Sequence, residues 1–273
     1  MSHDQLAHDR SGPQGATPVV LVHAGIADRR MWESACSALA AERDVVRLDL
    51  RGYGDSSRQP AGAWSPRGDV RALLADLGIE RAHFVGCSFG AGVCAEIALE
   101  HPDLVASLLL VAPGGSLLVD GEDLAAFVAV EDEALERDDL DAAVEANLVH
   151  WVDGAQRGPD VVPVEIREAV REMQRRAFEL TLPWPDEVWE AEDELEPGPV
   201  ERIGEITAPM LVLHGELDMA SVRDAADRLT ERAPDVRRVD WPDVAHLPSM
   251  ERPADFTELT LGWLAEVDAR AQG

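Results

Sequence analysis

A serine between two glycines is the feature of this chain that points most directly to chemistry. The residues Gly86-Cys87-Ser88-Phe89-Gly90 follow an apolar run at 82–85 and precede a run of small and apolar residues at 91–99. A strand that turns straight into a helix must reverse sharply, and a glycine on each side leaves room for that turn. The pattern predicts that Ser88 is a nucleophile whose hydroxyl projects from the end of a sheet.

A serine hydroxyl is a poor nucleophile at neutral pH unless a base is within reach and a carboxylate orients that base. The segment 214–218 follows one apolar run and supplies Asp218, and His246 lies after the next run. Because the carboxyl ends of parallel strands meet at one edge of a sheet, we expect Ser88, Asp218 and His246 to converge there. Glu216 is the alternative acid, although its longer side chain makes Asp218 the better candidate.

The segment His23-Ala24-Gly25-Ile26 follows the first long apolar run and supplies a further component. Acyl transfer builds negative charge on a carbonyl oxygen, which two backbone N–H groups can stabilise. We expect Gly25 and Phe89 to donate those hydrogen bonds. We expect the imidazole rings of His23 and His214 to hold the neighbouring loops in place.

The order of strands and helices must place these residues. The sequence predicts an alternation typical of a doubly wound, mostly parallel α/β sheet with right-handed crossovers. The predicted strands are 6–9, 19–22, 45–48, 82–86, 107–111, 210–213 and 236–239, and the predicted helices are 31–40, 69–77, 91–99, 222–232 and 255–267.

The alternation stops between residues 114 and 205, where the periodicity is helical and Trp151, Trp184 and Trp189 occur. We therefore predict a core domain formed by 1–113 and 206–273, with 114–205 inserted as a helical lid. The insertion holds 26 of the 53 acidic residues but 7 of the 24 basic ones. Most of these carboxylates are expected on a solvated helix face, and the alternative is that they exclude anionic substrates.

Composition excludes several classes of function. The net charge of −29 argues against nucleic acid and membrane partners, and the complete absence of lysine rules out a lysine Schiff base or a P-loop lysine. The sequence contains no metal-binding motif, so neither a metal nor a cofactor is expected. Three cysteines are too few for a disulfide framework, and residues 1–10 lack the apolar core of a signal peptide. We expect a cytoplasmic protein, monomeric or homodimeric, acting on a small molecule.

The chain resembles the α/β-hydrolase superfamily over nearly its whole length. The matching segments are 86–90, 23–26, 49–56, 214–218, and His246 followed by Glu251-Arg252-Pro253. Within that superfamily it resembles small cofactor-free esterases, enol-lactonases and C–C bond hydrolases, which carry a helical lid between two strands of the sheet. A serine at position 88, where haloalkane dehalogenases and epoxide hydrolases have aspartate, argues against those two groups. Segment 49–56 is interpreted as a structural turn beneath the active site.

The resemblance implies a serine hydrolase that cleaves a small or medium, largely apolar ester or lactone through an acyl-enzyme. Three alternatives remain: cleavage of a carbon–carbon bond in a vinylogous diketone, ligand binding without turnover, and a cyclase or acyltransferase reaction. We expect the substrate pocket to be shaped by apolar and tryptophan side chains, with Ile26, Trp32, Trp151 and Trp184 as the candidates.

Overall fold

The computed structural model describes residues 6–154 and 156–272, so half of the segment 1–10, whose composition was considered above, lies outside the described residues. These residues form a seven-stranded sheet in the order β1-β3-β2-β4-β5-β6-β7. Every neighbouring pair is parallel except β1 and β3. The predicted doubly wound, mostly parallel sheet is therefore confirmed. The strands are β1 (His8–Ser11), β2 (Val19–Val22), β3 (Val45–Leu48), β4 (Ala82–Cys87), β5 (Val105–Val111), β6 (Met210–Gly215) and β7 (Val236–Trp241).

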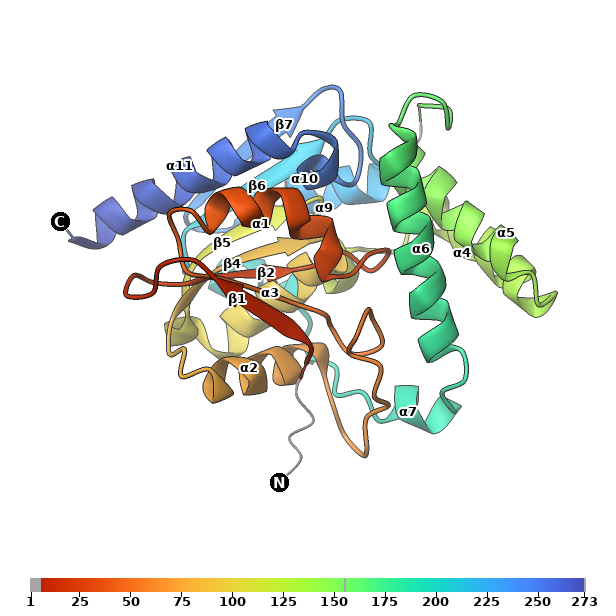
Figure 1. The fold of residues 1–273 in the computed structure, drawn as a ribbon, viewed down its shortest axis with the longest axis horizontal. Coiled ribbons are helices and arrows are strands. Elements are labelled where there is room, and N and C mark those ends of the chain that lie inside the picture. The colour runs from red at the N-terminus through yellow and green to blue at the C-terminus, as the bar shows by residue number, and fades with distance from the viewer. Residues whose placement is uncertain (1–5, 155, 273) are drawn as a thin grey trace.

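The central strands β2, β4, β5 and β6 are buried at every position because both faces of the sheet are covered. Alternate residues of a strand point to opposite faces. In β2, Val19 and Leu21 join one hydrophobic cluster, whereas Val20 and Val22 join another on the opposite face. Helices α1 and α11 pack into the first cluster, and α2 and α3 pack into the second (Figure 1). The helices of the core are α1 (Glu33–Leu39), α2 (Pro66–Asp76), α3 (Phe89–Glu100), α9 (Ala220–Arg232), α10 (Pro248–Glu251) and α11 (Pro253–Gln272).

Some boundaries differ from those predicted, for local reasons. Helix α2 begins three residues before the predicted start, because the Ser65 hydroxyl accepts a hydrogen bond from the amide of Gly68 and Pro66 takes the first helical position. The predicted helix at 31–40 is a 3-10 turn, η1 (Arg29–Trp32), followed by α1. Strand β1 is shifted toward Ser11, because its antiparallel pairing sets His8 opposite Leu48.

The segment between β5 and β6 is helical, and within its described residues it adds no strand to the sheet. Figure 1 shows α4, α5 and α6 gathered beside one side of the sheet, away from the C-terminal end of the chain. We call this group the cap helices. The elements of the segment are η3 (Gly115–Leu117), α4 (Glu122–Glu136), α5 (Leu140–Asn147), the π-helical η4 (Leu148–Asp153), α6 (Val164–Thr181), α7 (Asp186–Glu190), α8 (Pro199–Arg202) and η5 (Ile203–Glu205).

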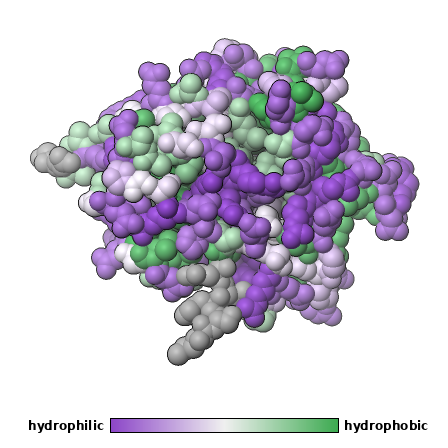
Figure 2. All heavy atoms as spheres, viewed as in Figure 1, coloured by the Kyte–Doolittle hydropathy of each residue, from purple (hydrophilic) through white to green (hydrophobic). Residues whose placement is uncertain are grey.

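Hydrophilic residues dominate the face of the molecule in Figure 2, where hydrophobic residues form small separate patches. The cap carboxylates are mostly exposed, in agreement with the predicted solvated helix face. Across the described residues, no helix combines the length and apolar character that crossing a membrane requires.

Candidate active site

Ser88 occupies a strained turn between β4 and α3. Its backbone angles are φ 52° and ψ −115°, a region that residues other than glycine rarely adopt. A methyl group on Gly86 would lie 2.7 Å from the carbonyl carbon of Gly90, and one on Gly90 would lie 2.6 Å from the carbonyl oxygen of His23. Only glycine fits at both positions. At Gly86 the cause is crowding within the turn, as predicted, whereas at Gly90 the cause is the close approach of the backbone of Val22 and His23.

The hydroxyl of Ser88 is not used to cap the helix that follows it. The backbone of Ser88 is held by the end of β5 and the loop after it. The Ser88 amide donates to the carbonyl of Val111 at 2.9 Å, and the Gly114 amide donates to the Ser88 carbonyl at 3.2 Å. A methyl group on Gly114 would lie 2.7 Å from Ser88 Oγ. Gly114, which sequence analysis did not single out, therefore keeps open the space around the hydroxyl.

We expect Gly114→Ala to lower kcat/KM for a p-nitrophenyl ester by about 10- to 100-fold, because the added methyl displaces the Ser88 side chain. The backbone of Gly114 is extended, at φ −144°, so alanine brings no backbone strain. The matched control is Gly262→Ala in α11, where an added methyl meets no atom within 4 Å. Steady-state kinetics with both variants makes the comparison. Wild-type activity in Gly114→Ala would contradict this role.

His246 and Asp218 form a buried pair at the carboxyl edge of the sheet. His246 Nδ1 lies 2.7 Å from Asp218 Oδ2, and each residue is 1% exposed. The second carboxylate oxygen accepts a hydrogen bond from the Met219 amide at 2.8 Å. Glu216, the alternative acid, is exposed. Asp218 therefore fixes the orientation of the imidazole and leaves Nε2 as its other functional atom.

The loop carrying His246 lies against the Ser88 turn. Cys87 Sγ is 3.7 Å from the carbonyl oxygen of His246, so the residues next to the serine and the histidine backbone are in contact. Among the described residues, no hydrogen bond joins the Ser88 hydroxyl to the imidazole. Such bonds are often long until substrate is bound. Burial raises the pKa of the Cys87 thiol, which makes it a packing group rather than a second nucleophile.

Gly25 and Phe89 lie side by side, as the oxyanion-hole prediction requires. A methyl group on Gly25 would be 3.4 Å from Phe89 Cβ. Within residues 6–154 and 156–272, neither of their amides donates a hydrogen bond to the protein. The Phe89 amide is also at the N-terminus of α3, where the helix dipole favours negative charge. Both N–H groups are thus available to an anionic oxygen.

His23 anchors the loop that carries Gly25, as expected. Its Nε2 accepts a hydrogen bond from the Leu50 amide at 2.9 Å, and its Nδ1 donates to the carbonyl of Ala24 at 2.8 Å. Burial lowers the pKa of this imidazole, so the ring stays neutral and supplies one donor and one acceptor. His214 differs from expectation: it bonds Asp240 at 3.0 Å and so joins β6 to β7 rather than holding the acid loop.

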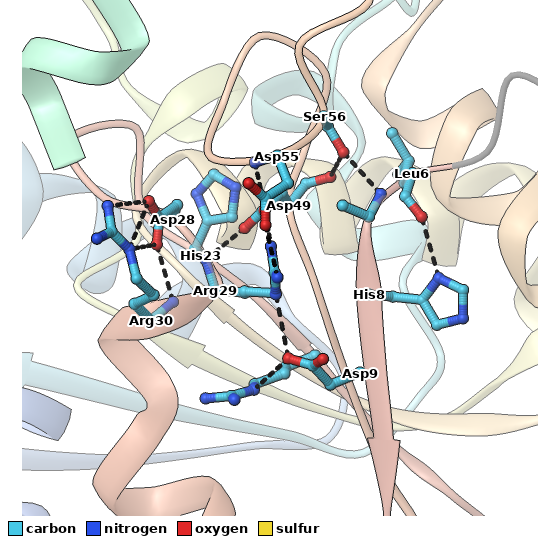
Figure 3. Close-up of polar contacts among 12 residues, drawn as sticks. Leu6, His8, Asp9, His23, Asp28, Arg29, Arg30, Asp49, Asp55 and Ser56 are labelled. Carbon is cyan, nitrogen blue, oxygen red and sulfur yellow. Dashed lines mark hydrogen bonds and ion pairs between the residues drawn. The ribbon is translucent and has the colours of Figure 1, made fainter.

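The turn at 49–56 is bonded to the segment that follows the Gly25 loop (Figure 3). Asp49 is fully buried, and its carboxylate accepts hydrogen bonds from the amides of Arg29 and Asp55, each at 2.8 Å. The Arg29 guanidinium pairs with Asp49 and also contacts Asp9 at 3.1 Å and Asp55 at 2.8 Å. The glycines and acids of this turn thus serve structure, as its sequence interpretation proposed.

Trp151 brings the cap helices to the candidate site. Its ring centroid is 4.6 Å from that of His246, and it also packs edge-on against Phe127 and His150. Burial lowers the pKa of His150 to about 4, so this second imidazole is neutral near pH 7. An aromatic group therefore borders the Asp218–His246 pair and reduces its contact with water.

Of the other predicted substrate-binding residues, Ile26 and Trp32 share a hydrophobic cluster with Trp151, and Trp184 lies outside that cluster. Trp32 is fully buried and stacks on Phe256 of α11 at 5.8 Å between ring centroids. Trp184 packs with Trp64 and Trp189, and a methyl on Gly52 would lie 3.1 Å from its ring. Ile26 is 6% exposed within the hydrophobic cluster that also holds Trp151. Their contact with substrate remains a prediction.

A buried ion pair joins the cap segment to the His246 loop, and sequence analysis did not find it. Arg157 and Glu251 form an ion pair in which each side chain is 8% exposed. Glu251 also accepts a hydrogen bond from the Ala245 amide at 3.0 Å. Arg157 donates as well to the carbonyls of Val152 and Asp153, both at 2.8 Å. The signal was the glutamate at 251, which the family resemblance includes but assigns no role.

Among the described residues, no group of three or more His, Cys, Asp or Glu side chains is arranged to hold a metal ion.

Comparison with known proteins identifies the family to which the chain is similar. Residues 17–158, more than half of the chain, match the family model of the alpha/beta hydrolase fold. A pimeloyl-[acyl-carrier protein] methyl ester esterase of Pectobacterium atrosepticum is 28% identical over 257 residues, covering 91% of this chain and 94% of that protein. A 2-hydroxymuconate semialdehyde hydrolase of Pseudomonas sp. (strain CF600) is 28% identical over 269 residues, covering 93% and 89%.

A third relative matches over a shorter region. The dihydrolipoyllysine-residue acetyltransferase component of the acetoin cleaving system of Pseudomonas putida is 41% identical over 126 residues. The matched region covers 43% of this chain and 33% of that protein, so the chain spans about a third of the length of this relative.

Solved structures give the same fold. A structure titled "Est816 as an N-Acyl homoserine lactone degrading enzyme" superposes with a TM-score of 0.70 at 26% identity, covering 94% of this chain and 96% of that one. The enol-lactonase from Burkholderia xenovorans LB400 superposes with a TM-score of 0.74 at 24% identity, covering 95% and 96%, a likeness of fold alone.

Proposed function

The chain belongs to the alpha/beta hydrolase fold family, and from that premise we propose that it is a serine hydrolase of small or medium, largely apolar carboxylic esters or lactones. The observation that carries the proposal is the Asp218–His246 hydrogen bond, which lies against the strained Ser88 turn. The similarity to a methyl ester esterase over nearly the whole chain supports an ester substrate.

In the proposed acylation step, Ser88 Oγ attacks the substrate carbonyl carbon while His246 Nε2 takes the hydroxyl proton. The pair of electrons from the carbonyl bond moves to its oxygen, which the amides of Gly25 and Phe89 stabilise. Asp218 holds the imidazole by Nδ1 and stabilises its charged form. Collapse of the tetrahedral intermediate expels the alkoxide, which leaves with the proton from His246.

In the proposed deacylation step, water takes the place of the alcohol. His246 removes a proton from the water, whose oxygen adds to the acyl carbon, and then returns the proton to Ser88 Oγ as the acid leaves. A lactone follows the same two steps, except that its alcohol and acid remain parts of one molecule. No cofactor is needed to balance either step.

We also propose that residues 114–205 act as a lid over this site. The support is the position of Trp151, whose ring packs on the His246 ring, and the Arg157–Glu251 pair that ties the segment to the His246 loop. Aromatic side chains at the base exclude water and favour apolar acyl groups. The acidic surface of the lid favours neutral substrates over anionic ones.

We expect a fluorophosphonate to form one covalent adduct, on Ser88, and to abolish hydrolysis of p-nitrophenyl esters. Intact-mass measurement and peptide mapping locate the adduct. Stopped-flow assays are expected to show a burst of p-nitrophenol followed by steady release, as acyl-enzyme kinetics require. An adduct elsewhere would refute Ser88 as nucleophile, whereas tight ligand binding with negligible turnover would favour a receptor.

Cleavage of a carbon–carbon bond is the second candidate, because a 2-hydroxymuconate semialdehyde hydrolase is as similar to the chain as the methyl ester esterase. The same serine, histidine and oxyanion donors would serve it. Product analysis after incubation with a vinylogous diketone distinguishes the two, since release of a carboxylic acid fragment at a rate above that of the best ester would favour this candidate.

A further inference from the structure

Tyr53, the single tyrosine of the chain, stands beside both proposed oxyanion donors. A methyl group on Gly25 would lie 3.7 Å from the Tyr53 hydroxyl and 3.4 Å from Phe89 Cβ. The rings of Tyr53 and Phe89 are 6.4 Å apart between centroids. The hydroxyl and the two amide-bearing residues therefore share one small region at the carboxyl edge of the sheet.

The turn that carries Tyr53 is held rigidly. The Tyr53 amide donates to the Leu50 carbonyl at 3.0 Å, and the Ser56 amide donates to the Tyr53 carbonyl at 2.9 Å. The tyrosine ring meets the His23 ring edge-on, with centroids 4.9 Å apart, and His23 is itself bonded to the Leu50 amide. A donor fixed in this way needs little reorganisation when charge develops nearby.

The Tyr53 hydroxyl is free to serve a ligand. Its side chain is half-buried, and among residues 6–154 and 156–272 no hydrogen bond of the protein involves the hydroxyl. Burial raises the pKa of Tyr53 to about 12, and the nearby carboxylates of Glu131 and Glu192 add to that rise. The phenol thus stays protonated, and able to donate, at every pH at which esterases are ordinarily assayed.

We propose that the Tyr53 hydroxyl is a third donor to the oxyanion, beside the amides of Gly25 and Phe89. This inference rests on the proposed serine hydrolase function. The phenol transfers no proton: it hydrogen-bonds the carbonyl oxygen as the bond from Ser88 forms and negative charge develops on that oxygen. Because the bond strengthens with the charge, Tyr53 acts on the transition state more than on substrate binding.

Tyr53→Phe tests the proposal by removing the hydroxyl while keeping the ring contacts with His23 and Phe89. We expect kcat for p-nitrophenyl butyrate to fall by about 10- to 100-fold, with KM changed less than about twofold. The melting temperature is expected to stay within a few degrees of wild type. A kcat within twofold of wild type would overturn the proposal and leave the serine hydrolase assignment standing, since that assignment rests on Ser88.

A transition-state analogue separates oxyanion stabilisation from a packing role. Ser88 Oγ adds to the carbonyl carbon of a trifluoromethyl ketone and forms a hemiketal with an anionic oxygen, whereas the matching methyl ketone keeps its neutral carbonyl. We expect Tyr53→Phe to raise Ki for the trifluoromethyl ketone by the same factor by which kcat/KM falls, with little change for the methyl ketone. A fall in kcat with unchanged Ki for both inhibitors would overturn the proposal.

Because the chain has one tyrosine, biosynthetic replacement by a fluorotyrosine changes this phenol alone and keeps the full sequence. In tetrafluorotyrosine the four ring fluorines lower the phenol pKa far enough to bring its deprotonation into the pH range in which esterases are assayed, and only the protonated phenol donates. Activity is therefore expected to decline with rising pH at a lower pH than in the unmodified enzyme. The titratable groups near the phenol, Glu131, Glu192 and His23, are the same in both proteins. Identical alkaline limbs would overturn the proposal, even if Tyr53→Phe failed to fold.

Discussion

Replacing Ser88 by alanine is expected to lower kcat/KM for p-nitrophenyl esters by about 10⁴- to 10⁶-fold. The substitution removes the atom that forms the acyl-enzyme and leaves the base and the oxyanion donors without a nucleophile to serve. What activity remains comes from binding and oxyanion stabilisation, which alone accelerate hydrolysis by about 10³-fold over water. Progress curves at high enzyme concentration measure this remaining activity.

The control for this variant is Ser57→Ala, which removes an exposed hydroxyl from the neighbouring loop and should leave kinetics unchanged. Ser88→Ala should also lose fluorophosphonate labelling while keeping its fold, because alanine at a strained φ of 52° costs no more than serine there. Turnover within tenfold of wild type by Ser88→Ala would refute the serine hydrolase assignment outright.

Asp218→Asn is expected to lower kcat by about 10⁴-fold with a smaller effect on KM. An asparagine amide can donate to His246 Nδ1, which places the imidazole proton on Nε2 and prevents that nitrogen from accepting the serine proton. The loss of charge also removes the stabilisation of the imidazolium. The 2.7 Å contact between Nδ1 and the buried carboxylate is the geometric basis for this expectation.

Glu216→Gln is the matched control, since it makes the same chemical change two residues away on an exposed side chain. It should retain wild-type kinetics. If Glu216→Gln lost activity and Asp218→Asn kept it, the acid would have been assigned to the wrong residue. Kinetics across pH 5–9 with both variants makes the comparison complete.

Much of the fold follows from patterns that act over short distances in the chain. The run Val19–Val22 is apolar at each position, so it requires cover on both faces, and the structure provides two separate clusters. Glycine at 86 is required by backbone crowding within its own turn, whereas glycine at 90 is required by the approach of the backbone at Val22 and His23. The start of α2 at Pro66 depends on the Ser65 cap, a local signal that lies outside the apolar periodicity of 69–77.

Contacts made across the fold could not be predicted in this way. His214 was assigned to its own loop, but the register of β6 and β7 sets it opposite Asp240, and registers depend on how whole strands pair. The stacking of Trp151 on His246 and the bond of Asp218 to His246 both join separate parts of the chain. The topology of the parallel strands predicts the contact of Asp218 with His246, whereas no comparable rule predicts where a cap helix lies relative to the sheet.

The Arg157–Glu251 pair has a consequence for the order of events in a turnover. Gly154 lies against the loops of both Asp218 and His246, since a methyl on it would overlap the carbonyl oxygen of Leu217 and would lie 3.0 Å from Ala245 Cβ. Moving the cap outward to admit substrate would separate Arg157 from Glu251, whose carboxylate also holds the Ala245 amide. Substrate entry and bond cleavage would then occur in separate conformations, with His246 fully aligned only after the cap has closed.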